Sequence, residues 1–149
     1  MSKETPSGTE RGKEAYSRRE IQVMQGLVDN LRERQFDTVY GIGPKGVSVI
    51  KKSLDERFSA TGDKGGLPRA VFRAAGLLDL SRLPRYCQEQ PNDLEVFIIG
   101  LSIKGYSRGR IGKRLEINQY KIEGYKREIC RKFGVKNFYQ VAALCAIRL

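Results

Sequence analysis

Basic side chains at helical spacing are the residues of this chain best suited to binding a ligand. Between residues 108 and 131, arginine and lysine recur within a stretch whose apolar residues follow a helical period. If Ile122 points into a core, a rotation of about 100° per residue defines which side chains point outward. The outward residues are Tyr120, Gly124, Arg127 and Arg131, flanked by Gln119, Lys121 and Glu123. Arginine and lysine on such a face can bond phosphate oxygens and the acceptor atoms of guanine, so double-stranded DNA is the expected partner.

A second group of cations lies on the segment just before this face. Arg108, Arg110, Lys113 and Arg114 belong to a short predicted helix. We assign them to phosphate contacts, because a supporting helix crosses the DNA backbone while the next helix enters the groove.

A weaker version of the same arrangement occurs in the first half of the chain. Around Val47 the outward positions are Lys45, Val49, Lys52 and Glu56, which include two cations and no arginine. Lys45 and Lys52 are therefore candidate DNA contacts. A structural or partner-binding role for this face remains the alternative.

The two halves share a pattern of apolar residues that repeats after 75 positions. The pairs are Phe36 and Ile111, Tyr40 and Leu115, Ile42 and Ile117, Val47 and Ile122, Ile50 and Tyr125, Leu54 and Ile129, and Phe58 and Phe133. After Phe58 the offset falls to 71, because the first copy has a longer loop. A repeat of this kind predicts two copies of one structural unit.

The better copy contains the stretch GYSRGRIGKRLEINQYKIEGYKREICRKFGVKNFYQV over residues 105–141. Its diagnostic residues are Gly105, Ser107, Ile111, Leu115, Ile117, Ile122, Arg131, Lys132, Gly134, Val135 and Asn137, with Phe133 in the place of a leucine. In these residues and their spacing the stretch resembles the LuxR/GerE family of helix-turn-helix domains. The first copy resembles the family more faintly, through Arg19-Glu20, Leu31 and Gly41-Ile42. The resemblance implies a bacterial transcription regulator whose third helix enters the major groove.

The recognition segment departs from the family pattern. Where the family has Thr-Val-Lys, this chain has Lys121-Ile122-Glu123, so an anion replaces an expected cation. The base preference of the family therefore does not carry over.

We predict an all-α fold of two tandem four-helix helix-turn-helix units, packed or linked through their last helices. The expected boundaries are a disordered tail over 1–16, a degenerate unit over 17–78, a connector over 79–92 and a second unit over 93–149. Ser17 with Glu20 forms a capping box that begins the first helix. Pro84 and Pro91 limit the flexibility of the connector.

The core of the second unit and its helix ends are also predicted. Ser107 and Asn118 are expected to cap the second and third helices, and Gly134 to end the third in a left-handed conformation. The expected core residues are Ile111, Leu115, Ile117, Ile122 and Ile129, with Leu94, Phe97, Ile98 and Leu101 of the first helix beneath them.

The last predicted helix, over residues 138–149, is too apolar to remain uncovered. In the family, the last helix commonly makes dimer contacts. We therefore expect Val141, Leu144, Cys145 and Arg148 to meet either the last helix of the first copy or a second chain, which would form a homodimer.

Composition narrows the classes of function. The 149 residues carry a net charge of +11, which favours an anionic partner, and contain no histidine, the commonest general base near neutral pH. The three cysteines are widely spaced and suggest neither a disulfide framework nor a metal site. We expect no enzyme activity, no cofactor, no metal and no membrane partner, and a cytoplasmic, nucleoid-associated location.

Two functions follow from these observations. The first is a DNA-binding transcription regulator that acts by occupancy; if both units bind, they would cover half-sites about 10 base pairs apart. The alternative is an interaction protein that docks on RNA polymerase or another regulator without reading DNA sequence.

Overall fold

The fold is entirely helical over the part of the chain that the computed structural model describes, residues 16–148. The elements are α2 (Arg18–Val28), α3 (Glu33–Tyr40), α4 (Pro44–Arg57), α5 (Leu67–Ala74), the 3₁₀ helix η1 (Ala75–Leu77), α6 (Asp93–Ile103), α7 (Arg108–Leu115), α8 (Gln119–Phe133) and α9 (Phe138–Arg148). The predicted all-α class is confirmed for these residues. Of the predicted tail, residues 1–15 lie outside the described part. Tyr16 lies within it, stacked on the ring of Phe58.

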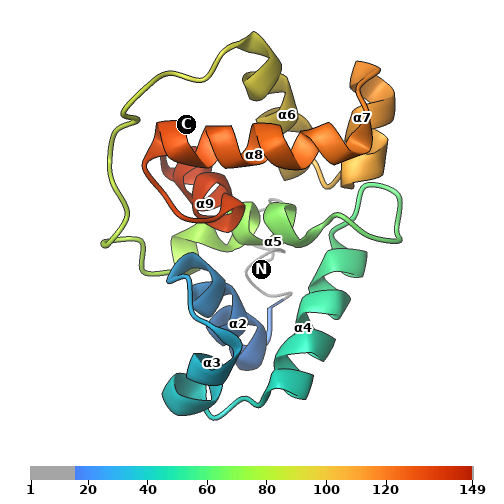
Figure 1. The fold of residues 1–149 in the computed structure, drawn as a ribbon. Helices are drawn as coiled ribbons and strands as arrows, with labels where there is room; N and C mark the ends of the chain where they lie inside the picture. The colour runs from blue at the N-terminus through green and yellow to red at the C-terminus, as the bar shows by residue number, and fades with distance from the viewer. Residues whose placement is uncertain (1–15, 149) are drawn as a thin grey trace, which may run out of the picture.

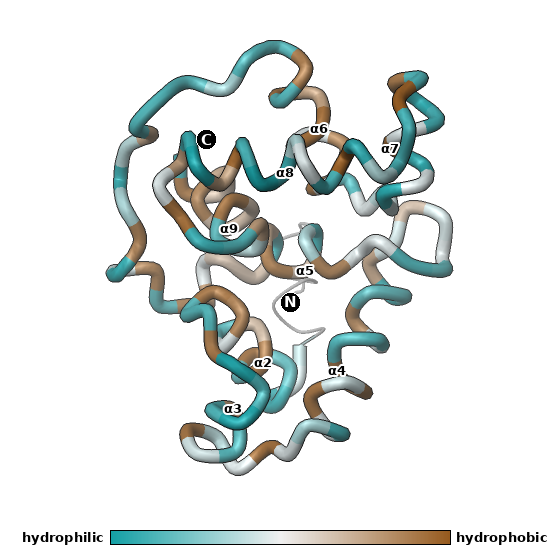
Figure 2. Tube along the Cα trace, viewed as in Figure 1, coloured by the Kyte–Doolittle hydropathy of each residue, from teal (hydrophilic) through white to brown (hydrophobic). Residues whose placement is uncertain are grey.

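Four helices in the first half, α2 to α5, are followed by four in the second half, α6 to α9. Figure 1 shows α5 and α9 in the middle of the molecule, with α2, α3 and α4 on one side and α6, α7 and α8 on the other. Along each half, brown apolar segments alternate with teal polar ones in Figure 2. This alternation is typical of helices that bury one face.

The 75-residue repeat extends to the helix caps. The Ser17 hydroxyl accepts from the backbone N–H of Glu20, whose carboxylate accepts from the Ser17 N–H. Asn92 and Glu95 make the same reciprocal pair 75 positions later. Both halves therefore begin with the same capping box.

Left-handed backbone conformations recur at the same offset. Asn30 and Gly105, which follow the first helix of each half, have φ of 57° and 93°. Gly41 and Glu116, which end the second helix, have φ of 69° and 55°. The chain thus turns in the same way at matching points of the two halves.

Burial follows the repeat as well. In six of the seven apolar pairs, both residues have the same degree of burial. The exception is Ile42, which is buried while Ile117 is half-buried. The paired residues therefore occupy equivalent places in the cores of the two halves.

The two halves meet through their last helices, because α5 packs against α9. Ala142 and Ala143 of α9 are fully buried and belong to the apolar cluster of the first half. Asn137 Nδ2 donates to the carbonyl of Leu27 at 2.8 Å, and Gln140 Nε2 to that of Val28 at 2.8 Å. Small side chains and satisfied polar groups let the second half complete the core of the first.

The contact between the halves is reciprocal. α2 packs on α9, and α6 packs on α5, so each first helix touches the last helix of the other half. The Ala60 N–H donates to the carbonyl of Gly105 at 2.8 Å. A Cβ at Gly105 would lie 2.5 Å from the carbonyl oxygen of Phe58, so only glycine permits this approach.

The connector contains no regular element, yet it is fixed to both halves. Gln25 Nε2 donates to the carbonyl of Asp79 at 2.9 Å. Arg148 donates to the carbonyl of Pro84 at 3.2 Å, and the Gln88 N–H donates to that of Lys132 at 2.8 Å. The connector is therefore held against both halves by hydrogen bonds.

One core prediction is wrong. Phe97 was expected beneath the second unit, yet its side chain is 62% exposed. The predicted Ile98 is in the core, and Ile99 faces the core in place of Phe97. The reason is that α6 is apolar on nearly every side, so its periodicity does not identify the buried face.

The predicted contact residues of α9 also need correction. Val141 and Leu144 are fully buried in the cluster of the second half, so they cannot meet a second chain. Cys145 packs against the same cluster, and Arg148 binds the connector. The residues of α9 that meet the first half's cluster are Ala142 and Ala143, which belong to it, and Tyr139, which packs against it.

Candidate nucleic-acid interface

Helices α7 and α8 are joined by a short turn and pack against one another. The Ser107 hydroxyl accepts from the Arg110 N–H at 3.4 Å, and Asn118 Oδ1 accepts from the Tyr120 N–H at 2.9 Å. A Cβ at Gly112 would lie 2.7 Å from the carbonyl oxygen of Ile117, so this glycine lets the turn approach α7. The predicted caps at both helix starts are confirmed, as is the left-handed Gly134 at the end of α8.

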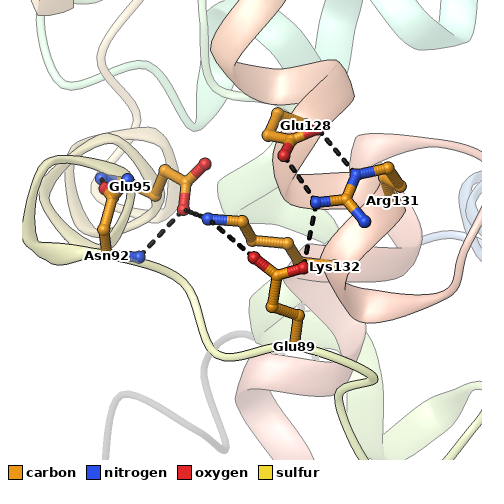
Figure 3. Close-up of polar contacts among 6 residues, drawn as sticks. All are labelled: Glu89, Asn92, Glu95, Glu128, Arg131 and Lys132. Carbon is orange, nitrogen blue, oxygen red and sulfur yellow. Dashed lines mark hydrogen bonds and ion pairs between the residues drawn. The ribbon is translucent and has the colours of Figure 1, made fainter.

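A buried ion pair fixes the C-terminal end of α8 to α6 (Figure 3). Lys132 Nζ lies 2.6 Å from Glu95 Oε1 and 3.7 Å from Glu89 Oε2. The hydrogen bond to Glu95 raises the pKa of Lys132, so the lysine stays charged at neutral pH. Arg57 and Glu20 form the matching pair in the first half at 3.1 Å, again 75 positions earlier.

The outward face of α8 carries most of the residues that the sequence placed there. Gln119, Tyr120, Lys121 and Arg127 are exposed, and the Tyr120 side chain is 70% exposed. Among the described residues, Lys121 and Arg127 form no ion pair. These side chains are therefore available to a ligand from outside.

Arg131 is exposed but already bound to two carboxylates. Its guanidinium lies 2.6 Å from Glu128 Oε2 and 3.1 Å from Glu89 Oε1 (Figure 3). The connector thus neutralises a cation that the sequence assigned to DNA. Arg131 instead helps to hold the connector against α8.

Glu123 is half-buried and lies beside Lys126, a residue that sequence reasoning passed over. Lys126 Nζ lies 5.0 Å from the centre of the Phe138 ring. Burial lowers the pKa of Lys126, and the nearby Glu123 opposes that shift. The positive charge of Lys126 offsets part of the repulsion that the nearby Glu123 would exert on a polyanion.

The four cations of α7 are all exposed. The guanidinium of Arg108 lies 5.3 Å from the centre of the Tyr120 ring, and that of Arg114 lies 4.8 Å from the Tyr106 ring. Arg110 and Lys113 line a depression of about 500 Å³ beside the turn. The contacts with the tyrosine rings order the guanidinium groups of Arg108 and Arg114 without neutralising their charge.

The same depression includes two residues from the loop that precedes α5, Asp63 and Lys64. The first half therefore reaches the surface of the second beside α7. Sequence spacing alone could not indicate this, because the loop and α7 are more than forty residues apart.

The corresponding face of the first half differs in kind. Lys45, Ser48, Val49 and Lys52 of α4 are exposed, and the Val49 side chain is 62% exposed. On α3, Val39 takes the position that Arg114 holds in the second half and is also exposed. Lys45 and Lys52 lie where the sequence placed them, with an apolar side chain between them.

The repeat allows a direct comparison of charge between equivalent elements. α7 and α8 together carry nine lysine or arginine residues and two glutamates. α3 and α4 carry five lysine or arginine residues and four acidic residues. Because six of the seven paired apolar positions have the same degree of burial, packing does not account for this difference in charge.

Comparison with known protein families, curated proteins and solved structures finds no match to this chain. Across residues 16–148, no helix combines the length and the apolar character needed to cross a bilayer.

Proposed function

We propose that this protein binds double-stranded DNA as a transcription regulator, with α8 in the major groove and α7 over the backbone. The single observation that carries the proposal is the excess of cations on α7 and α8 over the equivalent helices of the first half. DNA is a dense line of negative charge, so a concentration of exposed cations on one face of α7 and α8 favours it.

Gly124 supports the same proposal. A Cβ at this position would meet only the tip of Arg127, at 3.8 Å, so no internal contact requires glycine. Glycine inside a helix costs about 1 kcal/mol relative to alanine. A close approach of the DNA backbone or base edges to α8 would explain this glycine, because a side chain there would stand in the way.

In this proposal, residues are divided by role. Lys121 and Arg127 reach base edges, while Arg108, Arg110 and Lys113 contact phosphates. The first half acts mainly as an attached structural partner, with Lys45 and Lys52 as secondary contacts.

The test is a binding titration of a labelled DNA duplex, followed by fluorescence polarisation. Replacing both Lys121 and Arg127 with alanine should weaken binding by about 30-fold or more, because each good side-chain contact to a base contributes about 1–3 kcal/mol and the variant removes two. The matched control is the double replacement of Lys45 and Lys52, which occupies equivalent surface in the first half. Equal losses from both double variants would contradict the assignment of the groove to α8.

An interaction protein is the second candidate, and the near-neutral face of α3 and α4 favours it. Exposed valines at positions 39 and 49 are better suited to a protein surface than to phosphate. RNA polymerase or another regulator is the expected class of partner. Binding to purified RNA polymerase that is lost on Val49→Lys, with no binding to any duplex, would favour this function over the first.

A further inference from the structure

The outward face of α6 is apolar and uncovered. Val96 and Phe97 are 52% and 62% exposed, and no described residue packs over them. In Figure 2, α6 is coloured brown or white along much of its length. A helix that is apolar on nearly every side normally lies inside a protein, so this face is suited to a partner.

The repeat provides an internal control for this face. The first half has Gln22 at the position of Phe97 and Gln25 at the position of Gly100, in a helix of the same fold. The fold therefore does not require a phenylalanine there. Phe97 therefore has a role outside the fold of its own half, and the first half has no counterpart to that role.

Gly100 is the second unusual residue of the face. A Cβ at this position would meet no atom within 4 Å, so nothing inside the molecule excludes a side chain. Since a glycine in the middle of a helix is unfavourable, its value lies in the notch that it leaves on the surface.

Charges at the two ends of the face identify the occupant. Asp93 precedes Phe97 by four residues, and Lys104 follows Gly100 by four residues; both charged residues are exposed. If two α6 helices pack antiparallel with Phe97 over the Gly100 of a second copy, the same register places Asp93 beside Lys104 of that copy. The face is thus complementary to itself in shape and in charge, as a two-fold symmetric contact requires.

We propose that two copies of this chain associate through antiparallel α6 helices, with Phe97 of each seated in the Gly100 notch of the other. The contact is independent of DNA, because it includes none of the residues of α7 or α8. It covers about three helical turns, which is small for an interface, so the dimer is weak and its population depends on concentration.

Sedimentation velocity of the full chain tests the proposal, over a concentration series from about 1 to about 500 µM, the range in which weak dimers dissociate. We expect a monomer–dimer equilibrium without DNA. Phe97→Gln, which installs the residue of the first half, should raise the dissociation constant about 100-fold, because each dimer buries two copies of the side chain. The control Val39→Gln removes an equally exposed apolar residue elsewhere and should leave association unchanged.

A charge exchange provides a second test that does not depend on Phe97. Lys104→Asp should weaken the dimer by placing two acidic residues together, and adding Asp93→Lys should restore it, because the opposite charges meet again. Circular dichroism checks that each variant is folded. A wild-type chain that stays monomeric throughout the series would overturn the proposal. So would a dimer that tolerates Phe97→Gln, or a folded double variant that does not recover association.

Discussion

The proposed DNA binding should depend on salt concentration to an extent set by the four exposed cations on α7. Each phosphate contact contributes about −0.9 to the slope of log association constant against log salt concentration. If Arg108, Arg110, Lys113 and Arg114 each neutralise one phosphate, the slope is about −3.6. Raising potassium chloride from about 50 to about 200 mM should then weaken binding about 150-fold.

Removing one of these cations changes the slope by a predictable amount. Arg110→Gln should reduce it to about −2.7, so that the same change in salt weakens binding only about 40-fold. The control is Arg85→Gln, which removes an exposed cation of the connector and should leave the slope unchanged. Fluorescence polarisation at five or more salt concentrations measures each slope.

Two results would refute this reasoning. A wild-type slope close to zero would mean that binding, if present, does not depend on phosphate contacts. A normal slope that stays the same in Arg110→Gln and in Lys113→Gln would remove α7 from the backbone and leave the cations of α8 to explain binding.

Three further predictions concern the fold itself. Glu116→Gly should raise the free energy of unfolding by about 1 kcal/mol, because glycine removes the strain of a side chain at positive φ, while Gly41→Glu at the matching position should lower it by a similar amount; urea unfolding measures both, and changes of the same sign would contradict the assignment. Ala143→Leu should overfill the contact between the halves and lower stability by about 1–3 kcal/mol, whereas a higher melting temperature would mean that the contact has spare room. Burial raises the pKa of Cys130 to about 11, so its thiol stays protonated at neutral pH, and its alkylation rate, followed by mass spectrometry, should keep rising above pH 9 instead of reaching a plateau there.

Much of the fold was accessible from the sequence because the repeat supplied two views of one unit. Positions such as Val47 and Ile122 are apolar in both halves, and both are buried as the helical period requires. The capping box at Ser17 was also predictable, because its two side chains lie three residues apart on the chain. Local signals of this kind need no knowledge of the tertiary structure.

The remaining features depend on contacts between distant residues. The pairing of Arg131 with Glu89 joins the connector to α8, and no sequence period relates these positions. The exposure of Phe97 was hidden because its helix is apolar all round. One missed feature did leave a signal: adding 75 to Glu20 and Arg57 gives Glu95 and Lys132, the buried ion pair.

The shared core between α5 and α9 constrains how each part of this chain can change. A substitution at Ala142 or Ala143 acts on the stability of the first half, although both residues belong to the second. Substitutions on the outward faces of α4 and α8 touch no core and alter only what the surface binds. The outward surfaces of the two halves can therefore change independently, whereas the residues at their junction must change together. The different charges of the outward helices and the similar burial of the paired apolar positions agree with this pattern.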